Sequence, residues 1–121
     1  MKKEIAEKWV AALRSGAYSQ VTGALTYGGN GYCCLGVLCQ MAANEGATHR
    51  FESEHGGVYT YGSSRDNADT AYLPMDVRKW SGVGTHRGYV SSIDCSLATL
   101  NDNGKTFAEI ADVIQTHVEA L

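Results

Sequence analysis

The apolar stretch GYCCLGVLCQMAAN, residues 31–44, constrains the fold more than any other part of the sequence. Its apolar side chains recur at the i, i+3, i+4, i+7 spacing of one helical face, which predicts a helix that ends near Asn44, with Gly46 placed to stop it. Free cysteine behaves as a small hydrophobic residue, and Gly36 leaves room for another segment to approach closely. This helix should therefore contribute one face to the core, formed by Leu35, Leu38, Cys39 and Ala42.

Three of the four cysteines lie in this stretch, and a metal site, a disulfide and a nucleophile are the alternatives to simple packing. The spacing CC-x₄-C lacks the ligand pairs of a zinc site, and only Cys95 lies elsewhere, so we predict no metal site. Neighbouring cysteines on a helix point in different directions, which argues against a disulfide between Cys33 and Cys34. A thiol at a helix N-terminus can have a lowered pKa and act as a nucleophile. A small cysteine/histidine enzyme therefore stays open as an alternative, with its base among His49, His55, His86 and His117.

Length and charge narrow the class of protein. A chain of 121 residues with 44% apolar and 19% charged side chains predicts one domain over residues 1–121 that holds a core without disulfides or a metal. The net charge of −3 is scattered along the chain, which gives no electrostatic reason to expect duplex nucleic acid or an anionic membrane as a partner. Residues 1–16 carry charges where a signal peptide is apolar, and no apolar run approaches a membrane span, so we expect a cytoplasmic protein.

Three further helices are predicted from periodicity and capping. The N-terminal helix shows one apolar face and ends at Gly16, and a short helix lies between Pro74 at its first position and Gly82 at its end. The C-terminal helix opens with a T-x-x-E capping box made by Thr106 and Glu109. The apolar faces comprise Ile5, Trp9, Ala12 and Leu13 in the first helix, and Phe107, Ile110, Ile114, Val118 and Leu121 in the last.

Strands are predicted at residues 20–28, 57–62 and 85–93, where β-branched and aromatic residues gather or alternate. The sequence GGNG at 28–31 can be read as a hairpin-like turn, which we favour, or as an anion cradle before a helix. Because helices and strands show no regular βαβ rhythm, the predicted class is an α+β single domain, with a small antiparallel sheet packed against about four helices.

The central segment, residues 49–92, holds four of the five arginines and several aromatic residues. Arginine forks suit phosphates and aromatic rings suit a base, so this combination is typical of a nucleotide pocket; solvated loop arginines and core tyrosines are the alternative. Asn101 and Asp102, expected in a loop before the last helix, suit polar contacts to a ribose or base edge, or a turn. The candidate ligand-binding residues are therefore Arg65, Arg78, Trp80, Arg87, Tyr89, Asn101 and Asp102.

Four segments together resemble a family of small phage and prophage proteins: WVAALRSGAY, GYCCLGVLC, LPMDVRKW and LNDNGKTFAEIAD. Within that group, the size and phage character of the chain suggest similarity to anti-defence sponge proteins, especially the anti-Thoeris proteins. Those proteins sequester cyclic ADP-ribose signals, and some of them also bind cyclic oligonucleotides. The resemblance implies binding without catalysis and without a cofactor, in a dimer or larger assembly, with an aromatic side chain on adenine and arginines on phosphates. Those sponges use arginines late in the chain, whereas no arginine follows Arg87 here.

The sequence thus leads to the hypothesis of a phage anti-defence protein in the host cytosol. It would bind and sequester a cyclic nucleotide or cyclic ADP-ribose signal without cleaving it, in a pocket at a homo-oligomer interface. Two alternatives stay open: the cysteine/histidine enzyme, and a protein-binding inhibitor of a host defence factor, for which a large exposed apolar patch is expected.

Overall fold

The computed structural model describes residues 1–53 and 56–121 and shows an α+β domain. The predicted α+β class with about four helices is confirmed: among the described residues four helices have seven residues or more and a fifth is shorter, and the strands form three small sheets. The candidate base His55 lies outside the described residues. In the described part of the chain, no helix combines the length and the apolar character that crossing a bilayer requires.

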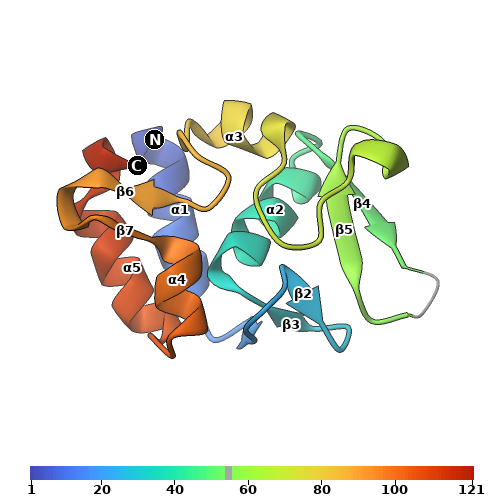
Figure 1. Cartoon of the computed structure of the whole chain (residues 1–121), viewed down its shortest axis with the longest axis horizontal. Coiled ribbons are helices and arrows are strands. Elements are labelled where there is room, and N and C mark those ends of the chain that lie inside the picture. Colours follow the sequence, from blue (N-terminus) through green and yellow to red (C-terminus); the bar gives the residue numbers. More distant parts are fainter. Residues whose placement is uncertain (54–55) are drawn as a thin grey trace.

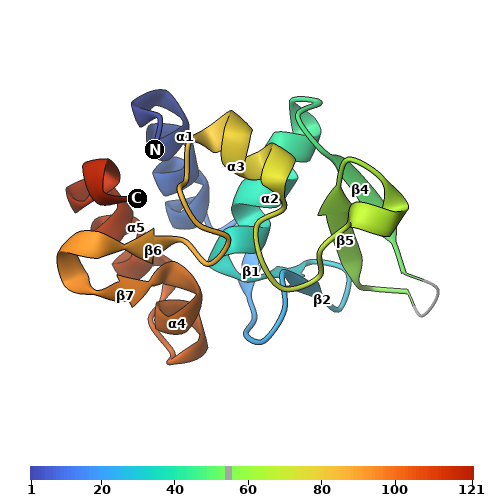
Figure 2. The same cartoon turned by 45° about the horizontal axis from the view of Figure 1, so that its top comes forward.

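Helix α2 (Cys34–Asn44) occupies the middle of the domain. In both views it lies between the hairpin of β4 (His49–Glu52) and β5 (Tyr59–Gly62) on one side and a group of three helices on the other (Figures 1 and 2). These helices are α1 (Lys3–Arg14), α4 (Leu97–Asp102) and α5 (Phe107–Thr116). The predicted core helix is confirmed, with Gly46 in the left-handed conformation after its end (φ +78°). It is buried on more than one face, because α1, α3 (Met75–Ser81) and α4 all contact it. Its buried residues are Cys34, Leu35, Gly36, Val37, Leu38, Cys39 and Ala42.

Helix α1 (Lys3–Arg14) packs against both α2 and α5 (Phe107–Thr116). The helix and its left-handed glycine, Gly16, are confirmed, but the predicted face is partly wrong. Ile5 and Ala12 are only half-buried, because contact with two helices turns a different stripe inward. That stripe consists of Ala6, Trp9, Val10 and Leu13.

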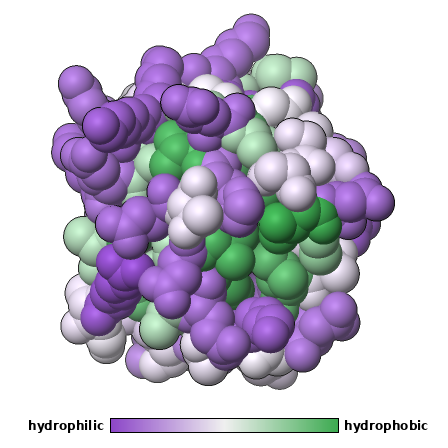
Figure 3. All heavy atoms as spheres, turned by 90° about the vertical axis from the view of Figure 1, so that its left-hand side faces the viewer, coloured by the Kyte–Doolittle hydropathy of each residue, from purple (hydrophilic) through white to green (hydrophobic). Residues whose placement is uncertain are grey.

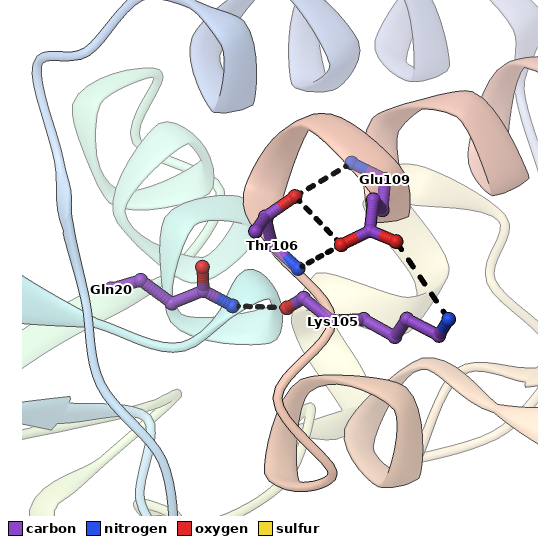
Figure 4. Close-up of polar contacts among 4 residues, drawn as sticks. All are labelled: Gln20, Lys105, Thr106 and Glu109. Atoms are coloured by element: carbon purple, nitrogen blue, oxygen red, sulfur yellow. Dashed lines mark hydrogen bonds and ion pairs between the residues drawn. The ribbon is translucent and has the colours of Figure 1, made fainter.

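The predicted capping box opens α5 (Figure 4). The Glu109 N–H donates to Thr106 Oγ1 at 3.2 Å, and the Thr106 N–H donates to Glu109 Oε1 at 3.2 Å. Hydrogen bonding to Thr106, with a smaller effect of Lys105, lowers the pKa of Glu109. Gln20 Nε2 donates to the Lys105 carbonyl at 2.7 Å, which ties the start of α5 to β1. Most of the predicted apolar face is buried, namely Phe107, Ile110, Ile114 and Leu121, but α5 ends at Thr116. Val118 and Leu121 therefore lie beyond the helix, where the chain forms a 3₁₀ turn, η3 (Val118–Ala120).

The strand predicted at 20–28 is wrong, because the chain turns inside it. β1 (Ser19–Gln20) and β2 (Thr26–Tyr27) both pair with β3 (Gly31–Tyr32), β1 in parallel and β2 antiparallel. Gly23 has a φ of +82°, and the turn it makes brings Leu25 against α2. The GGNG sequence forms the β2–β3 turn, which confirms the hairpin interpretation; β3 separates it from α2.

Two further hairpins complete the domain. β5 (Tyr59–Gly62), within the predicted 57–62 strand, pairs antiparallel with β4 (His49–Glu52), a polar strand that the sequence did not indicate. The strand predicted at 85–93 shrinks to β6 (Tyr89–Val90), which pairs with β7 (Cys95–Ser96) after a 3₁₀ turn, η2 (Ser91–Ile93).

Helix α3 (Met75–Ser81) confirms the predicted short helix. Pro74 is its N-cap rather than its first residue, because its backbone is extended (ψ 161°), and Gly82 ends the helix in the left-handed conformation.

Candidate functional site

Asn101 and Asp102 were predicted to lie in a loop. The structure places them instead in the last turn of helix α4 (Leu97–Asp102). The signal for this short helix is Ser96, whose hydroxyl accepts a hydrogen bond from the Thr99 N–H at 3.1 Å and caps it. Asn101 is 1% exposed, and Asp102 accepts the Gly23 N–H at 3.1 Å. Both side chains therefore fasten α4 to the segment that precedes α2.

Arg65, in the 3₁₀ turn η1 (Arg65–Asn67), lies beside the β4–β5 hairpin. Its guanidinium stacks 5.0 Å from the centre of the Phe51 ring and donates to the Glu52 carbonyl at 3.4 Å. These partners belong to the end of the molecule that lies away from α4 (Figure 1).

Arg78 and Trp80 belong to α3. The Arg78 guanidinium donates to the Gly84 carbonyl at 2.5 Å, so it folds back over the loop that follows the helix. Trp80 is half-buried against the core. Neither residue lines the surface hollow in which the structure places Arg87 and Tyr89.

Arg87 and Tyr89 come together in a surface hollow of about 470 Å³, which we call the Arg87 hollow. The Arg87 guanidinium lies 5.0 Å from the centre of the Tyr72 ring, and Arg87 Nη1 donates to the Tyr72 hydroxyl at 3.2 Å. The rings of His86 and Tyr72 pack edge to face, with their centres 5.1 Å apart. The remaining lining residues are Thr85, Asp94, Cys95, Ser96 and Thr99.

Tyr89 presents an accessible ring in this hollow, with 41% of the residue exposed. Its backbone N–H donates to Thr85 Oγ1 at 2.7 Å, and its hydroxyl donates to the Asp94 carboxylate, which raises the pKa of Tyr89. Asp94 follows η2 with a φ of +50°. The hollow therefore combines one arginine, one carboxylate and a held aromatic ring.

Three residues at this hollow were not among the candidate ligand-binding residues: His86 and Asp94, which line it, and Tyr72, which contacts Arg87. His86 could have been found from the sequence, because it is adjacent to Arg87. Tyr72 could not, because only the folded chain brings its ring beneath the Arg87 guanidinium.

Asn101 and Asp102 line a separate and much smaller hollow of about 40 Å³, together with Tyr72 and Cys33. That volume has room for about one water molecule. Tyr72 lies between the two hollows, since it lines the smaller one and its ring also stacks against the Arg87 guanidinium. The structure thus brings Arg87 together with Tyr89, and Asn101 with Asp102, as two neighbouring pairs.

A family model described as a domain of unknown function, DUF8296, matches residues 1–118. The chain belongs to this family. The match runs from α1 through α5 and includes the Arg87 hollow. No curated protein and no solved structure matches the chain.

The cysteines at the start of α2 are packed inside the DUF8296 domain. Burial raises the pKa of the Cys33 thiol to about 11 and that of Cys34 well above its usual value. Cys33 Sγ accepts the Gly36 N–H at 3.4 Å and caps the helix. These two thiols stay protonated at neutral pH, which removes the support for an activated nucleophile at this position. Among the described residues, no group of His, Cys, Asp or Glu side chains could hold a metal ion.

One thiol of this DUF8296 domain should react quickly with a small thiol reagent at pH 7.5. Cys95 is partly exposed, whereas Cys33, Cys34 and Cys39 are buried. We expect the absorbance of the released reagent to show one rapidly reacting thiol per folded chain and three more after unfolding. Cys95→Ser should remove the rapidly reacting thiol. A rapidly reacting thiol that survives in Cys95→Ser would show that a cysteine of α2 is reactive.

Proposed function

We propose that this protein binds and withholds a small nucleotide-derived signal, of the cyclic nucleotide or cyclic ADP-ribose type, without cleaving it. In this proposal it is a phage anti-defence protein of the host cytosol that works as a homo-oligomer. The observation that carries the proposal is the placement of Arg87 and Tyr89 in one hollow. A hollow of about 470 Å³ lies within the size range of small-molecule sites.

The chemistry of the Arg87 hollow suits the parts of a nucleotide. Arg87 provides a cation for one phosphate, and the exposed ring of Tyr89 provides a stacking surface for a base. Asp94 and the hydroxyls of Ser96 and Thr99 offer hydrogen-bond acceptors to ribose hydroxyl groups. A single arginine beside a carboxylate favours ligands of low charge over polyphosphates.

Native mass spectrometry is the direct test. The purified protein is incubated with cyclic ADP-ribose isomers and with cyclic di- and trinucleotides, and the compounds released by denaturation are analysed by chromatography. Recovery of intact ligand supports sequestration and gives the ratio of ligand to protein chains. Converted ligand would indicate an enzyme, and no binding would favour a protein target.

Arg87→Gln should weaken binding of the ligand found in this way at least about tenfold, because a charge-assisted hydrogen bond to phosphate contributes about 1.5–3 kcal/mol. Isothermal titration calorimetry measures the change. Lys79→Gln is the matched control, since it removes one exposed positive charge from α3. Arg65→Gln and Arg78→Gln should also bind normally, and a tenfold loss in either variant would contradict the placement of the ligand in the Arg87 hollow.

A protein-binding inhibitor is the second candidate, and a specific surface favours it. A groove of about 340 Å³ between α1 and α5 is lined by apolar side chains of Ala6, Val10, Ala11 and Val118, with charged residues at its border. Figure 3 views the side of the molecule that carries the chain ends and shows apolar surface gathered among hydrophilic atoms. This candidate predicts a host protein partner and no small ligand.

A further inference from the structure

We propose that a second hollow, between η2 and the end of α5, binds the phosphate group of a small sugar phosphate. This hollow measures about 760 Å³, and we call it the His117 hollow. It shares no lining residue with the Arg87 hollow and does not depend on the proposed function. The lining residues that carry the proposal are Lys3, Ser91, Ser92, His117 and Glu119.

Two lining residues of the His117 hollow, Ser92 and His117, are in close contact with each other. Ser92 Oγ lies 2.7 Å from His117 Nδ1. When Nδ1 carries the proton, the imidazole donates to Ser92 Oγ, and the hydroxyl proton of the serine is left to donate to a ligand. When the imidazole carries both protons, Nε2–H is a second donor on the same ring, whereas in the neutral Nδ1–H form Nε2 is an acceptor. An anion at this position can therefore receive hydrogen bonds from two side chains that are already in contact.

The backbone holds both partners in place. Ser92 lies in η2, and the neighbouring Ser91 hydroxyl donates to the Ala120 carbonyl at 3.4 Å, which links this turn to the segment after α5. The His117 N–H donates to the Val113 carbonyl at 2.9 Å and continues the helical pattern of α5. The Ser92–His117 contact thus joins two elements that the Ser91–Ala120 hydrogen bond also links.

Charge in the His117 hollow favours a phosphate of limited charge. Lys3 provides a cation, and the ion pairs among the described residues use other lysines: Lys8 with Glu45 and Lys105 with Glu109. Glu119 places a carboxylate at the border, which repels a second anionic group but accepts hydrogen bonds from hydroxyl groups. A single phosphate attached to a sugar meets both conditions, and the hollow has room for it.

Nuclear magnetic resonance titration tests the proposal. Inorganic phosphate and ribose 5-phosphate are added to ¹⁵N-labelled protein at constant ionic strength, with potassium chloride as the reference salt. We expect saturable shifts of the Ser91, Ser92 and His117 amides, with ribose 5-phosphate binding at least fivefold more tightly than phosphate. His117→Gln and Ser92→Ala should each weaken binding about tenfold, while Lys79→Gln should leave it unchanged.

Several results would overturn the assignment. Shifts that potassium chloride reproduces would mean a general salt effect, and shifts centred on Thr85 and Tyr89 would place the phosphate in the Arg87 hollow. Equal affinity for both compounds would exclude a sugar phosphate as the specific ligand. Ser92 is exposed and His117 is half-buried, so we expect both variants to fold, and the dispersion of each variant's spectrum checks this. Unchanged binding in both folded variants would also contradict the proposal.

Discussion

Gly36→Ala is expected to destabilise the domain by about 3–4 kcal/mol, at or above the upper end of what overpacking a core usually costs, because the overlap is with backbone atoms. A Cβ at this position would lie 1.9 Å from the Leu25 carbonyl oxygen and 2.8 Å from its carbon. Both are backbone atoms, so no side-chain rotation relieves the overlap. The Leu25 segment is also held in place, because its carbonyl accepts the Cys33 N–H at 3.0 Å and its own N–H donates to the Thr70 carbonyl at 2.8 Å.

Urea unfolding followed by circular dichroism measures this loss. Gly84→Ala is the matched control, since a Cβ there meets no atom within 4 Å and the backbone lies outside the left-handed region. It should change the unfolding free energy by less than about 0.5 kcal/mol. If Gly36→Ala unfolded within about 1 kcal/mol of the natural protein, the close approach of residues 21–27 to α2 would be wrong.

Asn101→Ala should cost about 3 kcal/mol, because it leaves buried backbone groups without partners. Asn101 Oδ1 accepts the Cys34 N–H at 3.1 Å and Gln20 Nε2 at 2.9 Å, and its Nδ2 donates to the Val21 carbonyl at 2.8 Å. One amide therefore joins α4 to the start of α2 and to the β1 segment.

The same unfolding measurement tests this second prediction. Asn103→Ala, two positions further along, replaces an exposed asparagine and should change stability by less than about 0.5 kcal/mol. Equal stability of the Asn101 and Asn103 variants would show that water replaces the hydrogen bonds of Asn101. That result would contradict its role as a buried junction.

The long helices could be predicted because their own periodicity and caps specify them. α2 shows this most clearly, since its apolar spacing predicted both the helix and its burial. α4 has six residues and too few turns for a period, so its stability comes from burying Leu97, Ala98 and Asn101 against neighbours far away in the sequence. The segment 20–28 has strand-forming residues, but Gly23 and the packing of Leu25 on α2 override that preference.

The candidate site was predicted in part for a related reason. Arg87 and Tyr89 lie two residues apart at the start of β6, so the local chain brings them to one hollow. Whether arginines that are distant in the sequence reach the same hollow depends on which ring or carbonyl group each guanidinium contacts in the folded chain. Arg65 finds Phe51 and Arg78 finds the Gly84 carbonyl, and neither contact has a signature in the sequence.

The stacking of Arg87 on Tyr72 has a consequence for the entropy of ligand binding. A free arginine side chain loses up to about 2 kcal/mol of rotamer entropy when a ligand immobilises it. Here Tyr72 already restricts the guanidinium, so less of that freedom is left to lose when an anion binds. In the proposed function, the affinity of the Arg87 hollow for an anion would therefore depend on Tyr72, beneath the arginine, as well as on Arg87 itself.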